Sequence, residues 1–199
     1  MAVLVVAEHD NQEIKSATLN TVTAAVELAA GDVEVLVAGE ACQAAAEGAA
    51  AISGISKVRV VDNALYANGL AEPFAALVVS IADAYSHIVL SHTTHGKNIA
   101  PRVAALLDIV QISDIMEVKS PDTFVRPIYA GNAMATVQAD EEKLVVTVRS
   151  TAFEKAELGG SAPIETAAAS ADPGLSSFVG QELTRSERPE LTSARIVVS

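Results

Sequence analysis

A polar loop at residues 93–98 contains residue types that could bind a phosphate or a nucleotide. It follows a short apolar run at residues 88–90 and precedes a helical apolar pattern, so it would join a strand to a helix. Ligands of open α/β sheets bind at such junctions, because the first turn of a helix presents backbone N–H groups. The candidate ligand-binding residues are Thr93, Thr94, Gly96, Lys97 and Asn98. A turn without a ligand and a subunit contact are the alternatives for this loop.

Two known phosphate-binding motifs are absent from the sequence. Gly96-Lys97 lacks both the earlier glycine at the required spacing and the Ser or Thr after the lysine, which excludes a P-loop. Residues 8–12 read E-H-D-N-Q, without the glycines of a dinucleotide fingerprint, which argues against Rossmann-type NAD binding. A free-standing nucleotide-binding module stays as an alternative function, and it depends on the loop residues named above.

The sequence offers no set of residues for a metal site or for catalysis. His92 and His95 are three residues apart, but no nearby Cys, Asp or Glu completes a set of metal ligands. Glu8 and Asp10 form a carboxylate pair whose surroundings are too polar to raise a pKa for acid–base work. The single cysteine, Cys42, lies in an Ala-rich helical stretch without a basic neighbour, so we expect it to be buried.

An alternation of apolar runs and amphipathic segments predicts the sheet that positions the loop. Strands are expected at residues 2–7, 33–37, 58–61 and 88–90, and helices at residues 13–30, 40–51, 74–82 and from about residue 98. Pro101 is expected in the first turn of the last helix, where its missing N–H costs nothing. Repeated β–α units with right-handed crossovers predict an α/β fold, with a mostly parallel sheet and helices on both faces.

Strand-like runs in the next part of the chain follow one another without helices, at residues 113–118, 122–128, 133–138 and 144–149. They predict hairpins that extend the sheet, and the polar turn at residues 140–143 should make the last two runs antiparallel. Gly131 and Asn132 should supply the positive φ of a tight turn between the middle runs. Arg126 and Arg149 should each have a carboxylate partner, in this chain or in another.

The composition argues against several classes of partner. With 13 Lys and Arg against 25 Asp and Glu, the formal charge is −12, which repels nucleic acid and anionic membrane surfaces. One cysteine among 199 residues gives no disulfide framework and favours a reducing compartment. No apolar run approaches the ~18 residues of a membrane span, and a strand begins directly after Met1, so neither membrane insertion nor a leader peptide is expected.

The composition also divides the chain into three parts. Residues 1–156 should form the α/β domain with its antiparallel extension. Residues 157–174 are rich in Gly, Ala, Ser and Pro, and should form a linker or a wrapping arm. Residues 175–199 should be a terminal strand segment, with strands at residues 178–183 and 194–199. The last strand is either the start of a further domain or an edge strand at a natural terminus.

Several strings of this sequence resemble the alpha subunits of electron transfer flavoproteins. One is H-G-K-N at residues 95–98 followed by P-R-V-A-A at residues 101–105. Others lie at residues 112–115 (I-S-D-I), 126–133 (R-P-I-Y-A-G-N-A), 148–153 and 186–191 (S-E-R-P-E-L). The likeness extends over essentially the whole chain, and it departs at His95, where relatives often have an aromatic residue.

The resemblance implies an adenine-nucleotide-hydrolase-like fold and a homologous beta subunit as partner. It also implies that FAD is held in the intact heterodimer, mainly by a carboxyl-terminal domain that this sequence stops short of, so no cofactor-binding residue is expected here. The intact protein would be an electron carrier rather than an enzyme, taking electrons from acyl-CoA and other dehydrogenases to a membrane quinone oxidoreductase.

This chain would then supply the scaffold and the subunit interface of that carrier. The interface candidates lie in the hairpins of residues 122–151 and are Arg126, Tyr129, Asn132 and Arg149. The lack of a transit peptide favours a bacterial cytoplasm, or a mitochondrial matrix if a leader has been removed.

Overall fold

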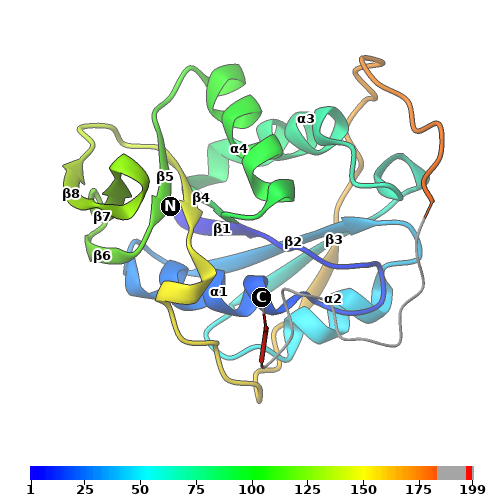
Figure 1. Ribbon diagram of the computed structural model, residues 1–199. Helices are drawn as coiled ribbons and strands as arrows, with labels where there is room; N and C mark the ends of the chain where they lie inside the picture. The colour runs from blue at the N-terminus through cyan, green and yellow to red at the C-terminus, as the bar shows by residue number, and fades with distance from the viewer. Residues whose placement is uncertain (183–195, 199) are drawn as a thin grey trace.

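A seven-stranded sheet forms the centre of the computed structural model, which describes residues 1–182 and 196–198 (Figure 1). The strand order is β10-β3-β2-β1-β4-β9-β5, and every neighbouring pair is parallel. The strands are β1 (Ala2–Val6), β2 (Val33–Gly39), β3 (Lys57–Asp62), β4 (Tyr85–Ser91), β5 (Gln111–Ile115), β9 (Leu144–Val148) and β10 (Ile164–Thr166).

Helices cover both faces of this sheet (Figure 1). On one face lie α1 (Ser16–Glu27) and α2 (Gln43–Ala50), and on the other lie α3 (Ala71–Ile81) and α4 (Thr94–Leu107). The short 3₁₀ turns are η1 (Ala64–Tyr66), η2 (Ala82–Ala84), η3 (Tyr129–Gly131) and η4 (Ser150–Ala152). The predicted α/β fold, with a mostly parallel sheet between two layers of helices, is confirmed.

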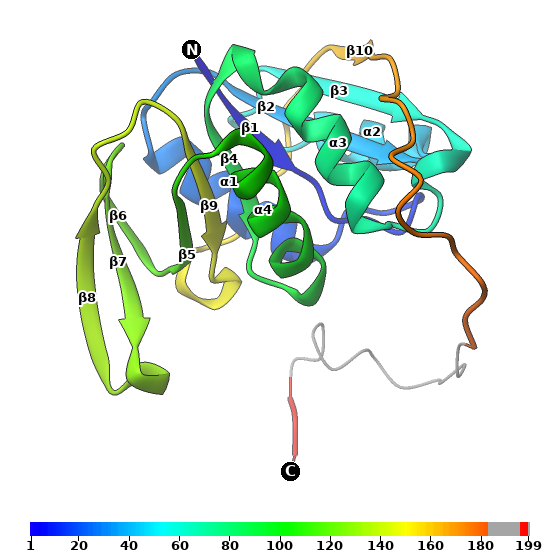
Figure 2. The same cartoon turned by 90° about the horizontal axis from the view of Figure 1, so that it is seen from above.

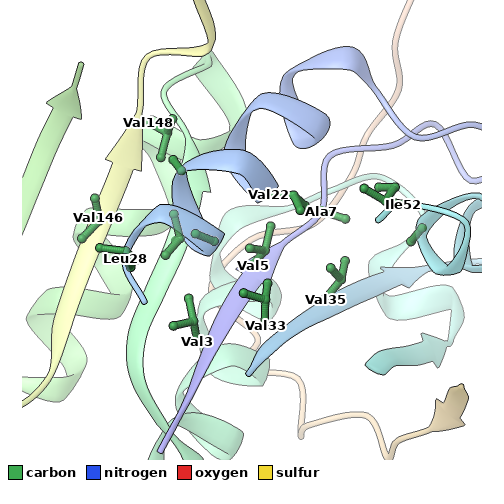
Figure 3. Close-up of a cluster of buried hydrophobic side chains, with 14 of the residues drawn as sticks. Val3, Val5, Ala7, Val22, Leu28, Val33, Val35, Ile52, Val146 and Val148 are labelled. Atoms are coloured by element: carbon green, nitrogen blue, oxygen red, sulfur yellow. The ribbon is translucent and has the colours of Figure 1, made fainter. Parts of the chain in front are cut away.

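The central strands are apolar on both sides because both sides are covered. Val3 and Val5 of β1 belong to the core under α1 and α2, while Leu4 and Val6 belong to the core under α3 and α4. Figure 3 shows the first of these layers, where Val22 of α1 lies over β1. Full burial of each such side chain stabilises the fold by about 1.5–3 kcal/mol, so these layers fix the positions of the strand ends.

A second, three-stranded antiparallel sheet lies beside the edge strand β5, at one end of the molecule (Figure 2). Its order is β6-β7-β8, with β6 (Glu117–Ser120), β7 (Thr123–Ile128) and β8 (Ala133–Gln138). Phe124 of β7 is 0% exposed and anchors this sheet in the core under α1. His87 of β4 also holds it, because the ring Nε2 donates to the Pro121 carbonyl at 2.8 Å. The predicted antiparallel extension is thereby confirmed.

The predicted pairing of residues 144–149 is wrong. Instead of forming a hairpin with β8, β9 lies parallel between β4 and β5 in the large sheet. All five of its residues are buried, and a strand without a polar side fits only where both faces are covered. The predicted strand at residues 113–118 is divided, because β5 ends at Ile115 in the large sheet and β6 begins at Glu117 in the small one.

The helix after β4 begins earlier than predicted. Thr94 is its first residue, and the Thr93 hydroxyl oxygen caps it by accepting the Gly96 N–H at 3.2 Å. Pro101 therefore lies inside α4 and not in its first turn, so that prediction is wrong. The apolar pattern predicted too late a start for the helix, because it begins only at Ile99, after a first turn made of polar residues.

The last part of the chain differs from the predicted strands. Residues 157–174 contribute an unpredicted edge strand, β10, which pairs with β3. Residues 178–182 of the strand predicted at residues 178–183 are exposed and have no regular structure, and residue 183 lies outside the described residues. Residues 196–198 are likewise without strand structure, and the rest of the strand predicted at residues 194–199 lies outside the described residues.

Candidate functional site

A cavity of about 450 Å³ lies at the carboxyl ends of β1 and β2. The strand order reverses here, because β1 pairs with β2 on one side and with β4 on the other. The helices that follow β1 and β4 lie on opposite faces of the sheet, and ligands of α/β sheets bind at such reversal points (Figure 1). The lining residues include Glu8, His9, Asp10, Tyr66, Phe74 and His95.

One wall of the cavity is a column of aromatic rings. Phe74 lies between Tyr66 and His95 in edge-to-face contacts, with ring centroids 5.4 Å and 5.5 Å apart. Burial lowers the pKa of His95, although the charge of Glu8 works to raise it. The His95 ring is therefore neutral at pH 7 and can pack against the planar face of a ligand.

The other wall is polar and carries negative charge. Burial lowers the pKa of His9, whose Nδ1 accepts the backbone N–H of Asn11 at 3.0 Å. A hydrogen bond from Lys15 lowers the pKa of Asp10 to about 2, so Asp10 is ionised at neutral pH. Glu8 accepts the Thr93 hydroxyl at 2.7 Å. Since the described lining residues include no Lys or Arg, the net charge of the lining is negative.

This lining does not fit FAD. The pyrophosphate of FAD is anionic and needs cationic side chains or a glycine-rich turn, whereas Glu8 and Asp10 stand at the cavity wall. A neutral or cationic molecule with a planar ring fits better, because it could pack on Phe74 and His95 and donate a hydrogen bond to Glu8.

The loop residues predicted to bind a ligand surround the start of α4 and do not line this cavity. Thr93 caps the helix and also donates its hydroxyl proton to Glu8. Gly96 is buried against β4, where a Cβ would overlap the carbonyl oxygen of Ser91. Thr94, Lys97 and Asn98 are exposed. A ligand-binding role for these residues stays a prediction, and His95 is the residue of this loop that lines the cavity.

Two of the predicted interface residues lie at the tip of the small sheet. Tyr129 is 78% exposed, and Asn132 is also exposed. The positive φ predicted at Gly131 is confirmed, while the one predicted at Asn132 is wrong, and Tyr129 and Ala130 also have positive φ. Residues with side chains seldom adopt positive φ, so this turn holds Tyr129 in an unusual backbone conformation.

The other two, Arg126 and Arg149, lie beside Asp114. Arg149 donates to both carboxylate oxygens of Asp114, with Nε and Oδ1 2.9 Å apart, which confirms the partner expected for Arg149. Arg126 donates from Nη2 to the Ser113 hydroxyl at 3.3 Å, and it has no carboxylate partner among the described residues. Burial works to raise the pKa of Asp114, but Arg149 and the other nearby cations lower it overall.

Within residues 1–182 and 196–198, no cluster of three or more His, Cys, Asp or Glu side chains could hold a metal ion. None of the helices described there is both long and apolar enough to cross a membrane. Cys42 is buried, as predicted, and burial raises the pKa of its thiol, which makes it a poor nucleophile.

Comparison with known proteins identifies the family. Residues 3–172 match the family described as "Electron transfer flavoprotein domain". The chain is 56% identical over 200 residues to "Electron transfer flavoprotein subunit alpha" of Pseudomonas aeruginosa, covering 100% of this chain and 64% of that relative. It is 57% identical over 199 residues to the alpha subunit of Bradyrhizobium diazoefficiens, covering 100% and 63%.

A mitochondrial relative is more distant. The chain is 44% identical over 212 residues to "Electron transfer flavoprotein subunit alpha, mitochondrial" of Dictyostelium discoideum, covering 98% of this chain and 60% of that relative. The chain thus spans 60–64% of the length of these curated relatives. The match to the family covers most of the chain and agrees with its parallel sheet, so the chain belongs to the electron transfer flavoprotein domain family.

Proposed function

We propose that this chain is the amino-terminal, flavin-free part of an electron transfer flavoprotein alpha subunit and acts as a scaffold that contacts a beta subunit. Two findings support a scaffold without flavin. The similarity to alpha subunits extends over the whole chain, and the lining of its cavity does not suit the pyrophosphate of FAD. The described residues also include no cluster that suits metal-dependent catalysis.

The observation that carries the proposal is the exposed apolar surface of the small sheet. Tyr129 is 78% exposed in η3, and Met134 is 51% exposed in the adjoining strand β8. Exposed aromatic and methionine side chains are enriched at protein interfaces, and these two belong to the same hairpin of β7 and β8. Asn132 lies between them in the chain and adds hydrogen-bonding groups. We call Tyr129, Asn132 and Met134 the docking tip.

Substitution at the docking tip tests the proposal. We expect Tyr129→Ala with Met134→Ala to weaken binding to an electron transfer flavoprotein beta subunit by about tenfold or more, because both side chains would be buried at the contact. The control is Leu175→Ala, because Leu175 is 76% exposed. It belongs to residues 168–182, a segment at the opposite end of the molecule from β8 (Figure 2). Gel filtration and calorimetry measure the binding. Equal weakening by both variants, or no binding by the unaltered chain, contradicts the proposal.

In the intact protein, we infer that FAD is held mainly outside this chain, and that the heterodimer takes electrons from acyl-CoA and other dehydrogenases to a membrane quinone oxidoreductase. The relatives named above come from bacteria and mitochondria, which supports a bacterial cytoplasm or a mitochondrial matrix as the location. An absorbance spectrum of the purified chain tests the flavin assignment. We expect no flavin bands, and retained flavin would contradict the assignment.

A second candidate function is binding of a nucleoside-type ligand at the strand ends. The cavity of about 450 Å³ at the reversal point of the sheet favours it. Because the lining carries two carboxylates and no described Lys or Arg, adenosine should bind better than AMP. Calorimetric titration of the chain with both compounds tests this, and a flat titration with adenosine would exclude it.

A further inference from the structure

Basic residues cluster where the small sheet meets the carboxyl end of β9. Arg126 comes from β7, Arg149 follows β9, and Lys97 lies in the first turns of α4. The Asp114 carboxylate lies beside them, because Arg149 forms an ion pair with it and the Nε2 of His92 is 3.7 Å from it. Burial has the largest effect on the pKa of His92 and lowers it. The charges of Lys97, Arg149 and Arg126 also lower this pKa, while the charge of Asp114 opposes them. We call Lys97, Arg126 and Arg149 the basic cluster.

The hydrogen bonds of Asp114 are largely committed to one member of the cluster. Arg149 donates to both of its carboxylate oxygens. Arg126 has a guanidinium with five N–H donors, yet its acceptor among the described residues is the Ser113 hydroxyl alone. Its Nε is buried and has no partner there. Lys97 is exposed and forms no ion pair in the described part of the chain. The cluster therefore has more donors than acceptors.

His92 also lies at this junction. Its Nδ1 is 2.9 Å from the Thr147 hydroxyl, whose oxygen accepts the Asp114 N–H at 3.0 Å. Burial lowers the pKa of this imidazole, so the ring is neutral at pH 7 and does not offset the unpaired cations. Nε2 lies 3.7 Å from Asp114, beyond a good hydrogen bond.

The backbone holds this arrangement in place. Asp114 has φ 62°, a left-handed conformation that is unfavourable for a residue with a side chain. Thr147 is 0% exposed, and the Arg149 N–H donates to the Ile115 carbonyl at 3.0 Å. These contacts hold Asp114 and Arg149 in fixed positions beside Arg126, so an anion that binds there adds little loss of side-chain entropy.

We propose that the basic cluster is a receptor for a carboxylate side chain presented by the beta subunit. The inference rests on the proposed function, since it assigns an acidic residue of the partner to this junction. Charge complementarity supports it. The chain has 25 acidic and 13 basic residues, yet Arg126 and Lys97 have no carboxylate partner among the described residues. An Arg guanidinium binds carboxylates in paired hydrogen bonds, which suits Arg126 to this role.

Arg126→Gln tests the receptor in the complex of this chain with the beta subunit. We expect the dissociation constant to rise by about tenfold or more, because the partner carboxylate would lose its counter-charge. Lys119→Gln is the matched control, because Lys119 also lies in the small sheet but already pairs with Glu117 at 2.8 Å. The control should change the dissociation constant by less than about twofold. Raising the salt from about 0.05 M to about 0.5 M should weaken the unaltered complex more than the Arg126→Gln complex.

A second variant keeps the test valid if Arg126→Gln does not fold. Lys97 is exposed, so Lys97→Gln should fold normally and still weaken binding several-fold. Binding by both variants as tight as that of the unaltered chain would overturn the receptor while leaving the proposed function intact. Failure of the unaltered chain to bind a beta subunit would instead overturn the proposed function. Equal loss of affinity in Lys119→Gln would overturn the receptor as well, because it would show a general effect of charge.

Discussion

Gly96 lies at the closest approach of α4 to the central sheet. A Cβ here would overlap the Ser91 carbonyl oxygen, which is part of the backbone and cannot rotate away. We expect Gly96→Ala to lower the free energy of unfolding by about 1–3 kcal/mol, because α4 must shift from β4. Urea unfolding followed by circular dichroism measures this. The control is Gly180→Ala, because no atom of the described residues lies within 4 Å of a Cβ there. Equal stability of the two variants would contradict the prediction.

Individual residues of the site were only partly predictable from their types. The sequence indicated the loop after β4, because Thr93, Gly96 and Lys97 are residue types found at phosphate sites. In the structure, Thr93 caps the helix and Gly96 allows its close packing, and a ligand-binding role for them stays a prediction. The aromatic wall was not predictable, because Tyr66 and Phe74 come from another β–α connection. They come close to His95 at the start of α4 only because of the strand order of the sheet. Local sequence patterns do not encode this order.

At the scale of elements, the strands with continuous apolar runs were predictable, but their neighbours were not. The L-V-V-T-V sequence of β9 indicates a buried strand, yet its position after β8 suggested a hairpin. The structure places it between β4 and β5, where both of its sides are covered. β10 was not predictable as a strand, because only Ile164 of its three residues is apolar. Its backbone pairing with β3 makes it a strand, and backbone pairing leaves no periodic signal in side chains.

The small sheet depends on one aromatic anchor. Phe124 is 0% exposed and joins β7 to the core under α1. We expect Phe124→Ala to cost about 3–5 kcal/mol of unfolding free energy and to speed hydrogen exchange in β6, β7 and β8. Phe178→Ala is the control, because Phe178 is 43% exposed in a segment without regular structure. Slow exchange in the small sheet of the Phe124→Ala variant would show that other contacts hold the sheet.

At the scale of the whole molecule, histidine burial makes stability depend on pH. Burial is the largest cause in each case and lowers the pKa of all four histidines, which are His9, His87, His92 and His95. Two of them line the cavity, His87 links β4 to the small sheet, and His92 lies beside Asp114, next to the basic cluster. Protonation in acid would therefore disfavour the folded state in several regions together.

The direction of the pH effect follows from proton binding. Below about pH 6.5, the unfolded chain protonates these rings while the folded chain does not, so the free energy of unfolding should fall as the pH is lowered from 7 to 5. Above pH 7 neither state binds these protons, and the histidine contribution should be constant. The pKa values of Asp10 and Asp122 are lowered to about 2, so the stability they contribute is lost only in much stronger acid. Urea unfolding at pH 8, 7, 6 and 5 measures the effect. His87→Gln removes one of these rings and keeps a side-chain donor for the Pro121 carbonyl, so the free energy of unfolding should depend less steeply on pH below pH 6.5. A free energy of unfolding that rises toward pH 5 in the unaltered chain would contradict the role of the histidines.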